Sequence, residues 1–127
     1  MNELRFAGEI LDRLQERNPR YHEQAFLFTL SALQSVVSTL PEPRHISGSE
    51  LAHEVRRQAM TRFGLMARTV LGHWGIHATA DVGEVVFAMV DCGVLVTDEG
   101  DTREDFEGVF DFEEVFVRDY PWGAAIQ

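Results

Sequence analysis

Residues 79–97 have the sequence TADVGEVVFAMVDCGVLVT, in which the hydrophobic spacing changes at Gly93. Before this glycine, apolar residues recur at intervals of three and four, which is typical of a helix with one buried stripe, here Val82, Val85, Val86, Met89 and Val90. After it, residues 94–97 form a short run of β-type residues. The stretch therefore predicts a helix over residues 80–92, capped by Thr79 and ended by Gly93 in a left-handed conformation, followed by a strand.

Four more helices are predicted upstream, where the same spacing recurs over residues 3–17, 19–40, 48–62 and 65–74. The second has two apolar stripes, so we expect it to be the central helix, with Asn18 as its N-cap. Ser47 and Glu50 match a capping box at the start of the third. Gly75 is predicted to end the fourth helix in the same left-handed way as Gly93 ends the fifth.

The C-terminal region allows two interpretations. Acidic residues alternate with Phe110 and Phe112, which together with residues 94–97 predicts a two-stranded hairpin with an acidic tip over residues 98–107. Alternatively, Asp111 caps a last helical turn over residues 111–117. The order of elements is that of a winged helix, although fold alone implies no function.

We therefore expect one domain over residues 1–117, followed by a tail over residues 118–127. Its predicted class is α+β, mostly α, with about five helices and then a short C-terminal β-hairpin, winged-helix-like in arrangement.

Charge is divided unevenly between the two halves of the chain. Residues 1–70 hold nine Arg and eight acids, a formal charge of +1, whereas residues 71–127 hold two Arg and thirteen acids, a formal charge of −11. The predicted acidic surface comprises Asp81, Glu84, Asp98, Glu99 and Asp101. Such a surface repels nucleic-acid phosphates, so DNA binding through it is disfavoured. The sequence favours a non-enzymatic protein-interaction or regulatory module that offers this surface to a cationic partner or to a second copy of itself.

A second interpretation starts from basic side chains within residues 44–62, namely Arg44, His45, His53, Arg56 and Arg57. This patch could bind nucleic acid or another phosphate ligand. Pairing along the helix is the competing and favoured explanation, with Glu54 beside Arg57 and Glu50 beside His53. A small-molecule enzyme of unknown type is the third hypothesis.

No motif predicts a catalytic residue, a metal or a cofactor. The spacing of His73 and His77 matches that of a zinc-binding helix, but Gly75 lies between them and is expected to end the helix. The lone Cys92, the absence of a signal-peptide pattern and the lack of a long apolar run predict a cytoplasmic protein without a membrane span.

Several spaced motifs resemble a family of short bacterial proteins of unknown function. They are RHISGSEL from Arg44, FGLMARTVL from Phe63, WGI from Trp74, DVGEVVF from Asp81 and DFEGVFDF from Asp105. The resemblance covers about residues 20–117 and implies no activity, so no functional residue follows from it.

Overall fold

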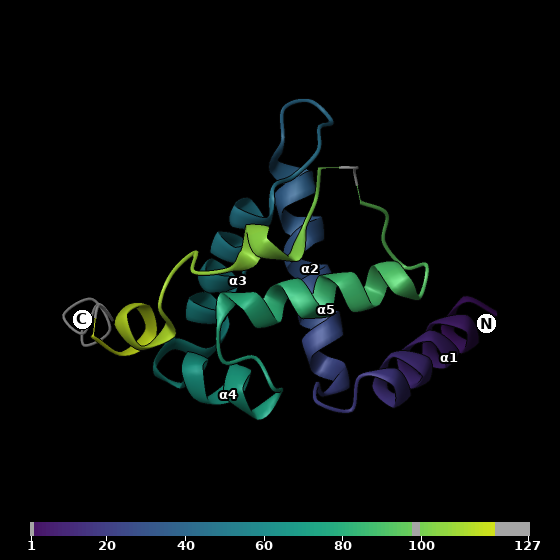
Figure 1. Cartoon of the computed structure of the whole chain (residues 1–127), viewed down its shortest axis with the longest axis horizontal. Coiled ribbons are helices and arrows are strands. Elements are labelled where there is room, and N and C mark those ends of the chain that lie inside the picture. The colour runs from purple at the N-terminus through teal and green to yellow at the C-terminus, as the bar shows by residue number, and fades with distance from the viewer. Residues whose placement is uncertain (1, 98–99, 119–127) are drawn as a thin grey trace.

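The computed structural model describes residues 2–97 and 100–118, with side chains from residue 8 onward. Within these residues the chain forms five α-helices and three shorter helical turns (Figure 1). The α-helices are α1 (Asn2–Arg17), α2 (Glu23–Thr39), α3 (Gly48–Phe63), α4 (Ala67–His73) and α5 (Thr79–Asp91). The shorter turns are the 3-10 turns η1 (Gly64–Met66) and η2 (Arg103–Phe106) and the π-helical turn η3 (Glu114–Arg118). None of the α-helices in the described part combines the length and the apolar run needed to cross a bilayer.

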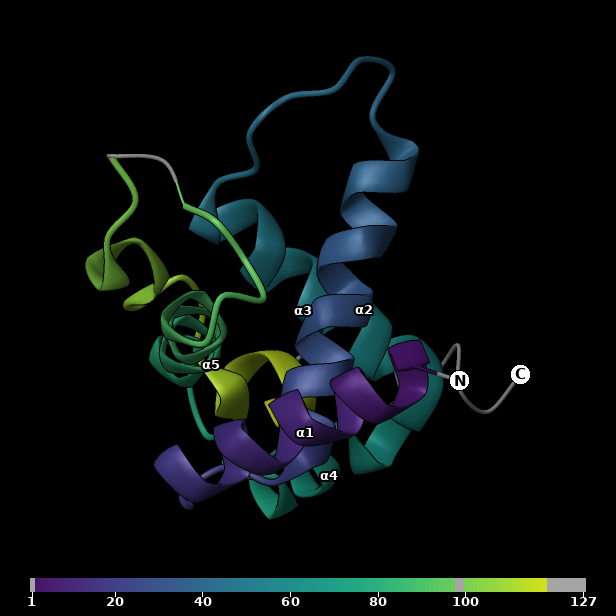
Figure 2. The ribbon, with the colours of Figure 1, turned by 90° about the vertical axis from the view of Figure 1, so that its right-hand side faces the viewer.

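Helix α2 is the central helix, as predicted, because it packs against α1, α3 and α5 (Figure 2). Ala25, Phe26 and Ala32 are almost completely buried on it. It begins at Glu23 rather than at residue 19, because the chain first makes a turn in which the Tyr21 amide donates to the Asn18 carbonyl. The N-cap is therefore His22 instead of Asn18, and its ring Nδ1 accepts from the Gln24 amide.

The predicted ends of α4 and α5 are confirmed. Gly75 and Gly93 have φ angles of +95° and +79°, the left-handed conformation that glycine adopts without strain. The Ile76 amide donates to the Leu71 carbonyl at 2.9 Å, and the Val94 amide donates to the Met89 carbonyl at the same distance. These are Schellman bonds, so local sequence alone identified both helix ends. The capping box of Ser47 and Glu50 at the start of α3 is also confirmed.

The predicted C-terminal β-hairpin is wrong, and with it the α+β, winged-helix-like class, because the described residues contain no strand. The reason is the packing of Phe106, whose side chain is 5% exposed and lies against two glycines in helices. A Cβ at Gly83 would come within 2.8 Å of its side chain, and a Cβ at Gly48 within 3.1 Å. To seat this ring on α3 and α5, residues 103–106 wind into η2 instead of extending as a strand.

After η2 the chain runs along α5 toward the N-terminus of that helix, away from residues 94–97 (Figure 1). The Thr79 hydroxyl accepts from the Val109 amide at 3.2 Å and fixes this course. Thr79 is therefore not the cap of α5. Ala78 is the N-cap, and its amide donates to the Asp81 carboxylate at 3.2 Å.

The alternative of a last helical turn is confirmed for the C-terminal region. The Asp111 carboxylate accepts from the Glu114 amide at 2.9 Å and starts the turn. Phe112, Val115 and Phe116 follow at helical spacing, and all three are buried in the core. The alternating acidic and Phe residues that suggested a strand thus belong to a partly helical and partly irregular segment, whose aromatic side chains contact the core at separate points.

Candidate functional site

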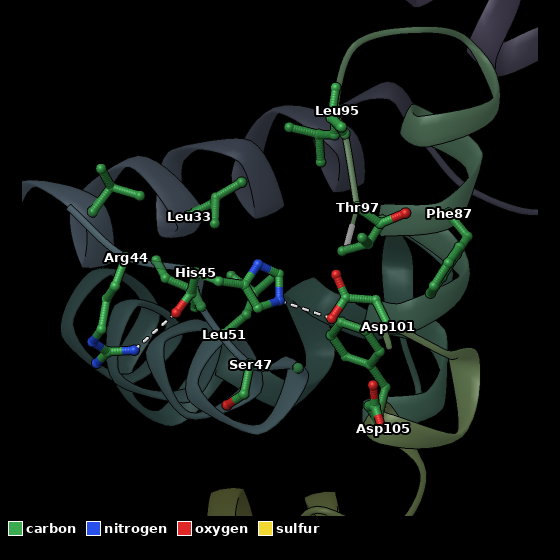
Figure 3. A pocket seen from close by; sticks show the side chains of 16 residues that line it. Leu33, Arg44, His45, Ser47, Leu51, Phe87, Leu95, Thr97, Asp101 and Asp105 are labelled. Carbon is green, nitrogen blue, oxygen red and sulfur yellow. Dashed lines mark hydrogen bonds and ion pairs between the residues drawn. The ribbon is translucent and has the colours of Figure 1, made fainter. Parts of the chain in front are cut away.

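An apolar cavity of about 190 Å³ lies between α2, the α2–α3 loop with the start of α3, α5 and the segment that follows α5 (Figure 3). Its walls come mostly from aliphatic and aromatic side chains, among them Leu33, Leu51, Val86, Phe87 and Leu95. A dry apolar cavity of about 150 Å³ is known to hold a molecule as large as benzene. This cavity is therefore large enough for a single aliphatic or aromatic group.

Arg44 borders the cavity and is neutralised by Glu50. Its two terminal nitrogens donate to the two Glu50 carboxylate oxygens at 3.0 and 2.7 Å, which is the forked geometry of a strong ion pair. These bonds, followed by the bond from the Ser47 amide, lower the pKa of Glu50 to about 2. Arg44 also donates to the His45 carbonyl at 3.0 Å and so stiffens the loop before α3.

His45 and Asp101 meet at the cavity mouth. Their side chains are joined at 2.8 Å between the His45 Nε2 and an Asp101 carboxylate oxygen (Figure 3). The contact links the α2–α3 loop to the segment after α5. It brings together two residues that sequence reasoning assigned to different surfaces, one basic and one acidic.

The rest of the predicted basic patch is also engaged within the chain. The Arg57 Nε donates to the Glu54 carboxylate at 2.9 Å, which confirms this predicted pair along α3 and lowers the pKa of Glu54. The other predicted pair, Glu50 with His53, is not formed, because Glu50 is paired with Arg44. Arg56 lies over the Phe110 ring at 5.8 Å, and the His53 ring lies 5.6 Å from that same ring. Each of the five predicted basic residues therefore has an intramolecular partner.

Asp81 does not belong to an exposed acidic surface. It is 5% exposed and accepts from the Arg20 guanidinium at 2.8 Å and from the Tyr21 hydroxyl at 2.6 Å. Its other oxygen accepts from the His77 and Ala78 amides. The carboxylate thereby joins the turn after α1 to the start of α5. Burial, followed by the bond to this carboxylate, raises the pKa of Tyr21.

The other predicted acidic residues have mixed positions. Glu84 is half exposed and lies 3.3 Å from the Arg103 guanidinium. Asp98 and Glu99 lie outside the described residues. Six further acids in the C-terminal half are exposed, and no described cation lies within ion-pair distance of them: Asp91, Glu104, Asp105, Glu107, Asp111 and Glu114. We refer to these six as the unpaired acids. Two of them, Asp105 and Asp111, accept backbone hydrogen bonds at the starts of turns.

Little in the described residues points to metal binding. No group of three or more His, Cys, Asp or Glu side chains within them is placed to hold an ion. His73 ends α4, so it shares no helix face with His77, as the glycine between them predicted.

Comparison with known proteins found no matching family model, no matching curated protein and no matching solved structure. The resemblance to a family of short bacterial proteins remains an interpretation of the motifs alone.

Sequence reasoning did not identify the cavity. Its walls come from four segments that lie far apart in the chain, and periodicity reports only which side of a helix is buried. One signal was present for the packing of Phe106, which lines the cavity: Gly83 lies within a helical pattern, and a helix-interior glycine often marks a close approach by another segment.

Proposed function

We propose that this protein is a non-enzymatic interaction module that binds a cationic protein partner through the unpaired acids of its C-terminal half. The observation that carries the proposal is the surplus of exposed carboxylates. Folding pairs Asp81, Glu84, Asp101 and Glu113 with side chains of the chain itself, but it leaves six exposed acids without a cation among the described residues. An uncompensated field of one sign attracts ligands of the opposite sign and speeds their association.

A second copy of the chain fits this surface less well than a cationic partner does. The net charge is −10, so two copies repel one another unless the contact brings basic side chains to the acids. Among the described arginines, several are already paired with carboxylates within the chain: Arg20, Arg44, Arg57, Arg68 and Arg103. The lone Cys92 and the composition favour the cytoplasm as the compartment of this function.

Nucleic-acid or phosphate binding through Arg44, His45, His53, Arg56 and Arg57 is less well supported. Arg44 and Arg57 are paired with Glu50 and Glu54, and a phosphate must displace those carboxylates before it gains either guanidinium. Counterion release on phosphate binding requires cations that are available at the surface.

Two variants of equal net charge test the proposal. The first, Glu104→Gln with Asp105→Asn and Glu107→Gln, removes three unpaired acids. The control, Glu9→Gln with Asp12→Asn and Glu16→Gln, removes three exposed acids of α1. Fluorescence anisotropy with an Arg-rich peptide at low and moderate KCl is expected to show salt-sensitive binding that the first variant weakens several-fold more than the control does.

Equal binding by the two variants would contradict the proposal, because the interaction would then depend on net charge alone. Binding of duplex DNA that Arg56→Ala with Arg57→Ala abolishes would favour the basic patch instead.

A further inference from the structure

We infer that the apolar cavity is the anchor point for this partner, taking one aliphatic side chain of a protein segment whose flanking residues are Lys or Arg. The inference rests on the proposed function and adds the site and the chemistry of the bound segment. Three observations carry it, concerning the size of the cavity, the apolar surface at its mouth and the charge around it.

The size of the cavity suits one side chain. Its volume of about 190 Å³ is smaller than the roughly 300–1,000 Å³ typical of sites that enclose whole small-molecule ligands. Protein interfaces hold single anchoring residues in well-packed pockets, and these residues contribute much of the binding energy.

Apolar surface continues from the cavity to the outside of the molecule. Val37 on α2 and Val96 after α5 both line the cavity, yet they are 52% and 94% exposed. These side chains form an uncovered apolar rim, which water solvates poorly. A partner segment that inserts one side chain would cover both.

The charge around the mouth selects a cationic segment. Arg44 is neutralised by Glu50, and His45 lies against Asp101. Asp105 lines the cavity, and Glu104 precedes it on η2; both belong to the unpaired acids. The charges of Arg44 and Glu50 cancel, and Glu104 and Asp105 add a formal charge of −2. An aliphatic group beside Lys or Arg is therefore attracted, whereas a fatty acid would bring a carboxylate toward like charge.

The test uses methyl NMR on the full chain with three short synthetic peptides. The first has one Leu flanked on both sides by Arg. The second has Ala in place of Leu, and the third has Glu in place of each Arg. The first is expected to shift the methyl signals of Leu33, Val86 and Leu95 and to leave those of Leu65 and Val117 unchanged. The Ala peptide should bind about tenfold more weakly or worse, since burial of a Leu side chain is lost. The Glu peptide should not bind.

Leu33→Gln places a polar group in the cavity wall, and Leu27→Gln makes the same change at an exposed site on α2 outside the cavity. If the Leu33→Gln variant binds the first peptide more weakly and the Leu27→Gln variant binds it as the native chain does, the result would support the cavity as the anchor point. Heteronuclear spectra with native dispersion establish that each variant is folded.

Three results would overturn the inference, and the first two also separate it from the proposed function. If Leu33→Gln has no effect while Glu104→Gln with Asp105→Asn weakens binding, acidic recognition holds and the anchor is wrong. If neither variant has an effect, both are wrong. Hexylammonium binding more tightly than the Leu peptide, with the same methyl shifts, would identify a small-molecule site and would also overturn the partner segment.

Discussion

Replacement of Gly83 by Ala tests the contact that overturned the predicted hairpin. Gly83 lies inside α5, where the added methyl group would meet the Cβ, Cδ2 and Cγ atoms of Phe106 at 2.8–2.9 Å. Non-bonded carbon atoms prefer about 3.5–4.0 Å, so the Phe106 side chain must move by several tenths of an ångström. That side chain is almost fully buried against two helices and has little room to do so.

Two opposing effects set the magnitude. Ala is favoured over Gly in a helix interior by about 1 kcal/mol, whereas overpacking a core typically costs about 1–3 kcal/mol. We therefore expect Gly83→Ala to lower the free energy of unfolding by up to about 2 kcal/mol. In a chain that already carries Phe106→Ala, the contacts with Cδ2 and Cγ are absent and only the contact with the Cβ atom remains, so the same substitution should lower the free energy of unfolding by less.

Urea denaturation followed by far-UV circular dichroism measures this double-mutant cycle. Gly8→Ala is the matched control, because it also lies within a helix but has no heavy atom within 4 Å of the added Cβ. It should stabilise the chain by up to about 1 kcal/mol in both backgrounds. If Gly83→Ala has the same effect with and without the Phe106 side chain, the packing of Phe106 against Gly83 is wrong. The explanation of why η2 replaces a strand is then wrong as well.

Three further predictions concern helix ends and buried polar groups. Gly93→Ala should cost about 1 kcal/mol from its φ of +79° alone, whereas Gly75→Ala should cost more, because its Cβ would also overlap the Arg20 carbonyl; thermal denaturation of both variants compares them. The pKa of Glu50 is depressed from 4.5 to about 2 by Arg44, so this pair stabilises the fold fully above about pH 4.5 and loses its effect as the pH falls toward 2. In urea titrations, the free energy of unfolding of Arg44→Ala should therefore differ from that of the native chain less at pH 2 than at pH 6. The pKa of Tyr21 is raised, so its contribution to the stability of the fold is complete below pH 10 and falls as the pH rises above 10. Tyr21→Phe should remove this loss of stability at alkaline pH, and it should cost about 1 kcal/mol or more at pH 7 because the hydrogen bond to Asp81 is lost.

The features that sequence reasoning predicted correctly are local ones. The left-handed ends at Gly75 and Gly93 and the capping box of Ser47 and Glu50 involve residues within about one helical turn of one another, so spacing alone determines them. The five helices follow for the same reason, because a periodic apolar stripe is visible within each segment.

The features that it missed depend on partners far away in the chain. Phe106 is seated against Gly48 and Gly83, which lie 58 and 23 residues before it. Asp81 was expected to be exposed because acids usually are, but Arg20 and Tyr21 stabilise its burial from about 60 positions away. The cavity was missed for the same reason, since its walls meet only after α2, α3 and α5 have packed.

Contacts within the fold account for only part of the uneven charge of the two halves of the chain. Asp81, Asp101 and Glu113 of the acidic half pair with Arg20, His45 and Arg68 of the basic half. The first contact joins the turn after α1 to α5, and the other two hold the segment after α5 against the α2–α3 loop and α4. These contacts explain why the two halves differ in charge, but they do not explain the excess. Like charges that remain unpaired destabilise a compact chain by mutual repulsion. Neutral polar residues would solvate the same surface without that cost, which is consistent with the proposed cationic partner.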